Sequence, residues 1–223
     1  MKEYREVLEP EYSEIYKEIE PSLTRVLKVL GKRKREYQQF KENAVEWYAR
    51  FVKAVTISGK VSSLQKLILI VKEPQLLSTL KLFMYLGLVE SIGNTIVDML
   101  VLLLIADGQP FHVERSLELP RIIHAKSFSD INPPNSTLAQ KLSFLKQNGL
   151  RTTSKFIDRK LRNDIAHLNF DVNKQGKIST RNYKKLDIDE RLNRFSKMFM
   201  AFLSIFKDSG FTDFLNLAMK KRD

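Results

Sequence analysis

The sequence predicts an all-α fold, a helical bundle with one small β-hairpin. Glycine (8) and proline (7) are scarce among 223 residues, which favours long helices over a β-fold with many turns. Apolar residues recur every three or four positions along much of the chain, as they do on amphipathic helices. With 43% hydrophobic residues, the chain can bury a sizeable core.

Residues 1–60 are expected to form an N-terminal helical extension, and residues 61–223 a helical domain. The first 20 residues are acidic, with seven Glu against three Lys and Arg. Tyrosines and isoleucines recur there at helical spacing. This segment therefore either docks as a short helix between Pro10 and Pro21 or lies on the basic remainder by charge attraction. The helical pattern that follows, over 22–55, indicates one helix or two.

A basic run, KRKR at 32–35, interrupts that pattern. Four adjacent cations can contact phosphates, but such a run more often forms a solvated face. The residues Ser58-Gly59-Lys60 then predict a break in the helix. Ser62 or Ser63 can cap the next helix, which Pro74 ends or kinks.

The longest helix is predicted over 76–106 and is stopped by the Asp-Gly-Gln-Pro sequence at 107–110. Its apolar character raises the question of a membrane span. However, Lys81, Glu90 and Asp98 interrupt it, and a spanning helix needs about 20 mostly apolar residues. We therefore expect a buried core helix and no association with a membrane.

A polar stripe runs along that helix. Glu90, Asn94 and Asp98 recur every four residues, so they share one face. Buried charge is costly unless it is paired, so this stripe is expected to meet basic groups or an interface. It then either lies beside Arg162 and His167 and orients them, or forms the solvent-exposed edge of a packed helix.

The last third of the chain predicts helices separated by one hairpin. A helix begins at Asn135 or Ser136 after an irregular segment. Asp187 caps the last long helix, whose apolar stripe continues to Phe206, and a short helix over 211–219 follows.

Between these helices, a helical pattern extends over 156–170 and is expected to be capped by Thr152 or Thr153. The chain then turns at 173–176 and returns through 177–180 as a hairpin.

The net charge indicates an anionic partner. It is +12 overall, −4 in the first 20 residues and +16 in the remainder. Such a surface attracts polyanions, among which RNA is common inside cells, although a generally lysine-rich surface is the alternative. The lack of Cys excludes disulfides and thiolate metal sites and fits a reducing interior or a hot organism. The N-terminus does not match a signal peptide, so a cytoplasmic protein is expected.

The candidate site is the segment Arg162-Asn163-Asp164-Ile165-Ala166-His167. On a helix of about 100° per residue, one apolar stripe contains Ile157, Leu161, Ile165 and Leu168. The opposite, outward face contains Arg159, Arg162, Asn163, Ala166 and His167. Asp164, at the edge of the apolar stripe, is expected to be structural.

RNA cleavage without a metal ion requires few protein groups, because the 2′-hydroxyl of the substrate is the nucleophile. An imidazole titrates near physiological pH, and a guanidinium stays charged and can hold phosphate through two donors. We therefore predict that Arg162 binds the phosphate and the transition state, and that His167 acts as acid or base. Asn163 is predicted to orient them, and Arg159 and Lys155 to extend the contact with substrate.

Other chemistry has little support in the sequence. The sequence contains three histidines, His112, His124 and His167, and none is paired with a carboxylate in a ligand-like motif, so no metal or other cofactor is expected. The sequence also lacks a glycine-rich phosphate loop and a nucleophile elbow.

The spacing of Arg162, Asn163 and His167 resembles the signature of HEPN domains, in which an Arg and a polar residue precede a His by three further residues. The flanking helices and hairpin are also similar, over roughly residues 75–206. The resemblance implies a HEPN-like bundle in which polar residues of the preceding long helix lie near the motif. It implies a metal-independent endoribonuclease that acts as a homodimer through a composite cleft and leaves a cyclic phosphate.

The same resemblance implies a biological context. Prokaryotic HEPN proteins are often toxins or antiviral defence effectors, so a possible partner is an antitoxin such as a nucleotidyltransferase-like protein. Two other functions stay open. A non-catalytic HEPN-like dimer would bind RNA or protein through the same basic cleft, with His167 as a structural histidine bonded to Asp164 or Asn163. A DNA-binding helical regulator would instead use the basic run at 32–35.

Overall fold

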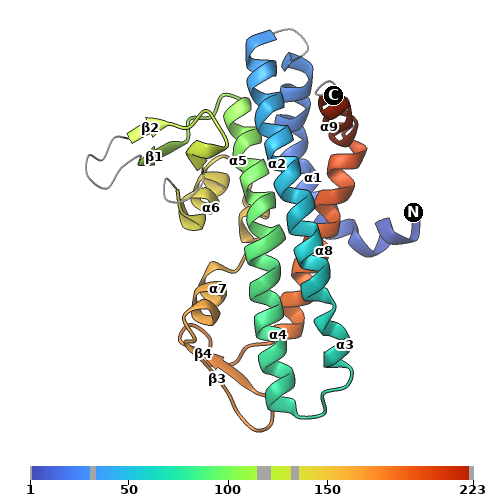
Figure 1. The fold of residues 1–223 in the computed structure, drawn as a ribbon, viewed down its shortest axis with the longest axis vertical. Coiled ribbons are helices and arrows are strands. Elements are labelled where there is room, and N and C mark those ends of the chain that lie inside the picture. The colour runs from blue at the N-terminus through green and yellow to red at the C-terminus, as the bar shows by residue number, and fades with distance from the viewer. Residues whose placement is uncertain (1, 31–33, 115–121, 132–135, 221–223) are drawn as a thin grey trace.

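Long helices and two small β-hairpins make up the fold (Figure 1). The computed structural model describes residues 2–30, 34–114, 122–131 and 136–220. The predicted all-α fold with a hairpin after the motif helix is confirmed. The helices are α1 (Lys2–Leu30), α2 (Lys34–Ser62), α3 (Leu64–Ile68), α4 (Pro74–Leu88), η1 (Val89–Gly93), α5 (Asn94–Ala106), η2 (Ser129–Ile131), α6 (Leu138–Gln147), η3 (Thr153–Lys155), α7 (Arg159–Ala166), α8 (Ile188–Asp208) and α9 (Phe211–Lys220). The strands are β1 (His112–Glu114), β2 (Ile122–His124), β3 (Phe170–Val172) and β4 (Ile178–Thr180).

The central element is a continuous helical rod formed by α4, the π-helical turn η1 and α5. Pro74 occupies the start of α4, where its missing N–H costs no hydrogen bond. All residues from Thr95 to Leu104 are buried, because helices α1, α2 and α6 pack around α5. Among the described residues, this rod is the one helix long and apolar enough to cross a membrane, and 67% of its most apolar window is buried inside the protein.

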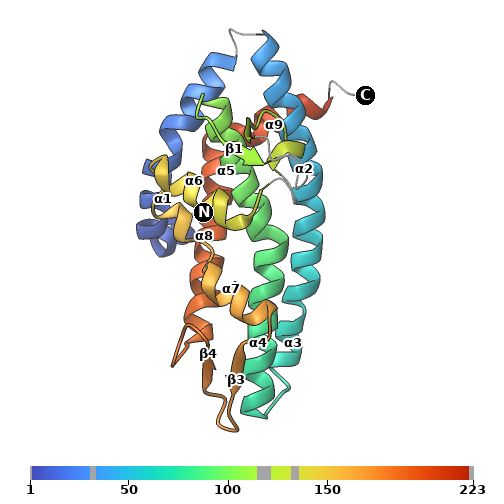
Figure 2. The ribbon, with the colours of Figure 1, turned by 90° about the vertical axis from the view of Figure 1, so that its left-hand side faces the viewer.

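Helices α1, α2 and α8 pack along the rod (Figures 1 and 2). The buried side chains of α1 include Ile15, Ile19 and Leu23. On α2, Trp47 is buried and donates its indole N–H to the carbonyl of Thr95 at 2.6 Å. The first two helices therefore contribute to the same hydrophobic core as the rest of the chain.

The expected division at residue 60 falls inside α2. The expected break at Ser58-Gly59-Lys60 does not occur, and α1 continues through both Pro10 and Pro21. A proline inside a helix removes one hydrogen bond, but the apolar stripe of α1 is continuous across Pro21 and packs against the core. The helical pattern over 22–55 belongs to two helices, because α1 ends at Leu30 and α2 begins at Lys34. Lys32 and Arg33 of the basic run lie outside the described residues, and Arg35 is exposed.

The hairpin after the motif helix pairs β3 with β4 in antiparallel register, with Phe170 opposite Thr180. Gly176 in its turn has a φ of +75°, and a Cβ there would lie 2.8 Å from the carbonyl oxygen of Pro74. The turn therefore needs glycine both for its backbone conformation and for its close approach to α4. A second hairpin, β1–β2, lies within the segment that was expected to be irregular.

Candidate functional site on helix α7

The motif helix α7 is shorter than its apolar pattern predicts. It begins at Arg159 because Asp158 caps it, with the Asp158 carboxylate accepting a hydrogen bond from the Leu161 N–H at 3.1 Å. Tyr183 fixes the other oxygen of that carboxylate with a hydrogen bond of 2.7 Å. The predicted cap at Thr152 or Thr153 is wrong, because Thr153 starts the separate short helix η3.

The end of α7 also differs from the prediction, and it places His167 at the C-cap. The Asn169 N–H donates to the Asp164 carbonyl at 2.7 Å, and the Leu168 N–H to the Ile165 carbonyl at 3.1 Å. These two bonds form a Schellman motif, with Leu168 in the left-handed conformation at a φ of +55°. Leu168 is 68% exposed, so its predicted place in the apolar stripe is wrong.

The inner face of α7 is held by apolar packing and by one buried carboxylate. Leu161 and Ile165 are fully buried. Asp164 is only 3% exposed and accepts hydrogen bonds from the Thr180 hydroxyl (2.6 Å) and from the Asn182 side chain (2.9 Å). Desolvation by burial alone would raise the pKa of Asp164, but these hydrogen bonds outweigh it and lower the pKa. The structural role predicted for Asp164 is therefore confirmed, and this carboxylate ties α7 to β4.

The outer face carries the predicted functional side chains. Arg159 and His167 are exposed, and Arg162 and Asn163 are half-buried. The His167 imidazole has no side-chain hydrogen-bond partner in the part of the chain that the structure describes, and it does not bond to Asp164 or Asn163. The helix therefore presents one imidazole and two guanidinium groups on its outer side, as its sequence pattern predicts.

Arg162 is held in place by two acceptors. Its Nε donates to the Glu90 carboxylate, and one of its terminal nitrogens donates to the Asn163 side-chain oxygen at 3.0 Å. The side chains of Arg162 and Glu90 are 29% and 38% exposed. An arginine has five N–H donors, so the remaining donors of Arg162 stay available for an anionic ligand.

Glu90 lies in the π-helical turn between α4 and α5. In that turn the Asn94 N–H bonds to the Val89 carbonyl, five residues back instead of four. This hydrogen-bonded turn contains one residue more than an α-helical turn, which changes the direction in which its side chains project. Such turns are frequent at functional sites. Sequence periodicity did not predict the π-helical turn.

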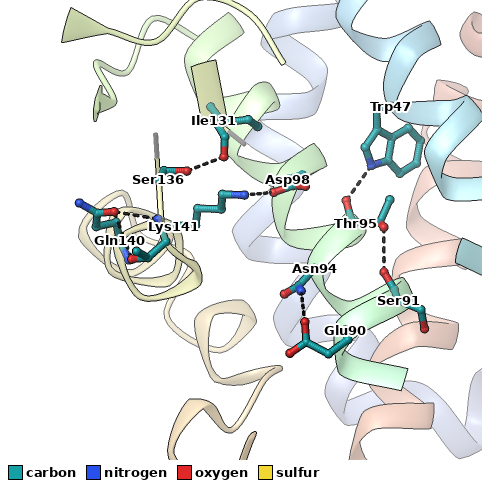
Figure 3. A network of polar contacts seen from close by, with 11 residues as sticks. Trp47, Glu90, Ser91, Asn94, Thr95, Asp98, Ile131, Ser136, Gln140 and Lys141 are labelled. Atoms are coloured by element: carbon teal, nitrogen blue, oxygen red, sulfur yellow. Dashed lines mark hydrogen bonds and ion pairs between the residues drawn. The ribbon is translucent and has the colours of Figure 1, made fainter. Parts of the chain in front are cut away.

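The predicted polar stripe meets basic groups at two separate places, Arg162 and Lys141. Figure 3 shows Asn94 beside Glu90 and Asp98 beside Lys141. Asn94 donates to Glu90 at 3.1 Å, so it supports the carboxylate that holds Arg162. Asp98 instead pairs with Lys141 of α6, away from the motif. Burial raises the pKa of Asp98, against the lowering effect of Lys141. The pairing predicted for the stripe is confirmed, but Asp98 holds α6 and makes no contact with Arg162.

Cations surround the motif in sequence and on the surface. Residues 151–185 contain ten Lys and Arg against three Asp, a net charge of +7. Two of the three carboxylates, Asp158 and Asp164, are already hydrogen-bonded inside the fold. Lys155 and Arg159 are exposed, and their side chains have no partner among the described residues. This surface is suited to a polyanion.

The segment that leads into α7 is anchored to α1, a contact that sequence reasoning missed. The carboxylate of Glu18 accepts hydrogen bonds from the N–H groups of Thr152 at 2.6 Å and Thr153 at 2.9 Å. Both donors are backbone N–H groups, so this contact does not test the expected charge attraction between the acidic N-terminal residues and the basic remainder.

Two cavities in the described residues lie away from α7. One, of about 270 Å³, is lined mainly by apolar side chains of α2, α4 and α8, and the other, of about 1290 Å³, lies beside β2. Neither Arg162 nor His167 lines these two cavities. Within the described ranges, no group of three or more His, Asp or Glu side chains is placed to hold a metal ion.

Comparisons of the chain with models of protein families, with curated proteins and with solved structures find no match. The function of the site is therefore inferred from its own residues.

Proposed function

We propose that this protein is a cytoplasmic, metal-independent endoribonuclease that cleaves RNA at a composite site formed by two copies of α7. The observation that carries the proposal is that the outer side of α7 holds both a fixed guanidinium, Arg162, and an exposed imidazole, His167, which has no side-chain hydrogen-bond partner among the described residues. The surrounding positive charge and the resemblance to HEPN ribonucleases support it.

The reaction requires no covalent protein intermediate. The 2′-oxygen of the substrate attacks the adjacent phosphorus, the bond from phosphorus to the 5′-oxygen breaks, and the products are a 2′,3′-cyclic phosphate and a 5′-hydroxyl. One His167 accepts the proton of the 2′-hydroxyl, and a second donates a proton to the leaving 5′-oxygen. Arg162 stabilises the charge on the phosphorus oxygens, while Asn163 and Glu90 orient it. Arg159 and Lys155 bind the neighbouring phosphates.

Two imidazoles are needed because the acid and the base act at the same time, and each chain supplies one at this site. A symmetric dimer places two identical patches against each other, so it brings both copies of His167 to one phosphate. The exposure of His167 on the surface of one chain is consistent with a cleft that forms between two chains. As a toxin or defence effector, the protein would be controlled by a partner such as a nucleotidyltransferase-like antitoxin.

The direct test is incubation of the full chain with RNA in excess EDTA. We expect the wild-type protein to cut the RNA, and the His167→Ala and Arg162→Ala proteins to lose at least a hundredfold in rate. Lys53→Ala serves as the control, because Lys53 is exposed on the second half of α2, outside α7. The loss of cleavage in EDTA, or an unchanged rate in both motif variants, contradicts the proposal.

The second candidate is a non-catalytic RNA-binding dimer. The observation that favours it is the ion pair between Arg162 and Glu90, which already occupies part of the guanidinium. This function predicts that RNA binds without being cut and that His167→Ala does not change the affinity.

A further inference from the structure

A large open groove lies at the other end of the molecule, between the first half of α2, the end of α5 and β2. It has a volume of about 1290 Å³. Pockets for small molecules usually measure about 300–1,000 Å³, so this groove is better suited to a segment of a polymer.

Specific hydrogen bonds hold the two walls of the groove in place. Gln39 and Asn43 on α2 donate to the carbonyl of Lys126, at 2.9 and 3.1 Å. The side-chain oxygen of Asn43 also accepts the Phe128 N–H at 3.1 Å. The segment after β2 is therefore fixed to α2, and the groove has a defined width.

The charged side chains of the groove are mainly cationic. Arg35 and Lys126 line it, are exposed, and have no side-chain partner among the described residues. Glu42 is the one carboxylate among the described lining residues, and it accepts a hydrogen bond from Gln38 at 2.8 Å. Two free cations in an open groove favour an anionic chain.

The groove also contains an exposed aromatic ring. His124 lines it and lies directly opposite His112 in the β1–β2 pair. The two imidazole rings are 4.5 Å apart between centroids, and both residues are exposed. Unstacked bases of single-stranded RNA stack on aromatic side chains, including histidine.

We infer that this groove binds nucleotides of single-stranded RNA, with Arg35 and Lys126 on backbone phosphates and His124 stacked against a base. Figure 2 shows the β1–β2 hairpin and α7 on the same face of the bundle, with α6 between them. A strand held in the groove can therefore extend along this face toward the motif. The inference concerns binding alone, so it stands independently of the proposed cleavage.

The test uses the full-length His167→Ala protein, so that RNA stays intact, and the anisotropy of a short fluorescein-labelled single-stranded RNA at several salt concentrations. The added double change Arg35→Ala/Lys126→Ala is expected to weaken binding at least tenfold. It should also reduce the slope of log K against log salt by about 1.4, since each phosphate contact on a single strand contributes about 0.7. The matched control is Lys53→Ala/Lys60→Ala, which removes two exposed cations from the other half of α2.

A separate arm tests the base contact. His124→Ala should weaken RNA binding about fivefold or more, whereas binding of inorganic polyphosphate, which has no bases, should be unchanged. Circular dichroism checks that each variant is folded. The inference is overturned if the Lys53/Lys60 control loses as much affinity as the groove variant, if His124→Ala binds RNA normally, or if duplex RNA binds more tightly than the single strand. Failure of these binding tests leaves the cleavage assay unaffected, so the two proposals fail separately.

Discussion

Leu168, which directly follows His167, has an unfavourable left-handed backbone conformation and an exposed side chain. A leucine in the left-handed conformation costs about 1–2 kcal/mol, and most helices place glycine at this position. Its φ of +55° completes the Schellman motif that ends α7 at the C-cap His167. Local strain of this kind is concentrated at functional sites, so we interpret Leu168 as part of the geometry that directs the imidazole outward.

Replacing Leu168 with glycine should therefore stabilise the protein. We expect a gain of about 0.5–1 kcal/mol in the free energy of unfolding, because glycine removes the strain but adds entropy to the unfolded chain. Urea denaturation measures this change. Leu168→Ala is the control, since it removes the same exposed side chain and keeps the strain. A gain of similar size in the alanine variant would show that the side chain, not the backbone, is the cause.

Asp164 should make the stability of the protein depend on acid pH. Its folded pKa is lowered, so its contribution is complete above the unfolded pKa of about 3.9 and is lost as the pH falls through the folded value. Asp164→Asn should cost about 1–3 kcal/mol at pH 7, because an amide cannot accept all the hydrogen bonds from Thr180 and Asn182. Denaturation between pH 7 and pH 2 should show a shallower loss of stability in the variant. An equally steep loss would contradict the role assigned to this carboxylate.

At the scale of elements, α6 depends on a buried ion pair with α5. Lys141 and Asp98 are both largely buried, and removing one partner leaves the other charge unpaired. Lys141→Met should therefore cost about 3–5 kcal/mol at pH 7. The pKa of Asp98 is already raised, and this change should raise it further. The variant should consequently lose stability as the pH rises from about 4 toward neutrality.

The matched control for this prediction is the double variant Asp98→Leu/Lys141→Met, which replaces the pair with apolar side chains. It should recover most of the stability and lose the added pH dependence. Thermal denaturation at pH 5 and pH 7 compares the three proteins. A single variant as stable as the wild type at pH 7 would show that the pair does not hold α6.

The sequence predicted the elements better than their ends. Apolar periodicity is a strong signal for long helices, and it correctly located the central rod and α8. It failed where a local interaction overrides the pattern, as at Asp158, whose side-chain cap starts α7 after the apolar run has begun. The continuation of α1 through Pro21 depends on tertiary packing, which outweighs the local cost of a proline.

The candidate site was partly predictable for the same reason. Helical spacing indicated that Arg162 and His167 lie outward, and the cost of burying charge indicated that Glu90 needs a basic partner. The particular pairs, Glu90 with Arg162 and Asp98 with Lys141, connect residues far apart in sequence and cannot be read from spacing. The π-helical turn and the groove beside β2 leave no pattern in a single sequence.

At the scale of the whole molecule, the proposed function requires a dimer in which two chains together form the active site. Each chain supplies one His167, so the rate per chain should fall when the protein is diluted below its dimer dissociation constant. Adding excess His167→Ala chains to the wild type should lower the rate further, because mixed dimers lack one imidazole. Lys53→Ala chains, which keep both motif residues, should instead add activity. A rate per chain that does not depend on concentration or on added inactive chains would contradict the composite site.

The central claim is that the 2′-hydroxyl of RNA is the nucleophile and that Arg162 and His167 supply the chemistry. The most direct measurement compares, in EDTA, an RNA that the protein cuts with the same RNA carrying one 2′-deoxy nucleotide on the 5′ side of the cut. We predict that the all-RNA substrate yields a 2′,3′-cyclic phosphate end and that the modified strand stays intact at that position. Cleavage of the modified strand at the same position, or a cut that occurs only when a divalent metal is present, would contradict the account.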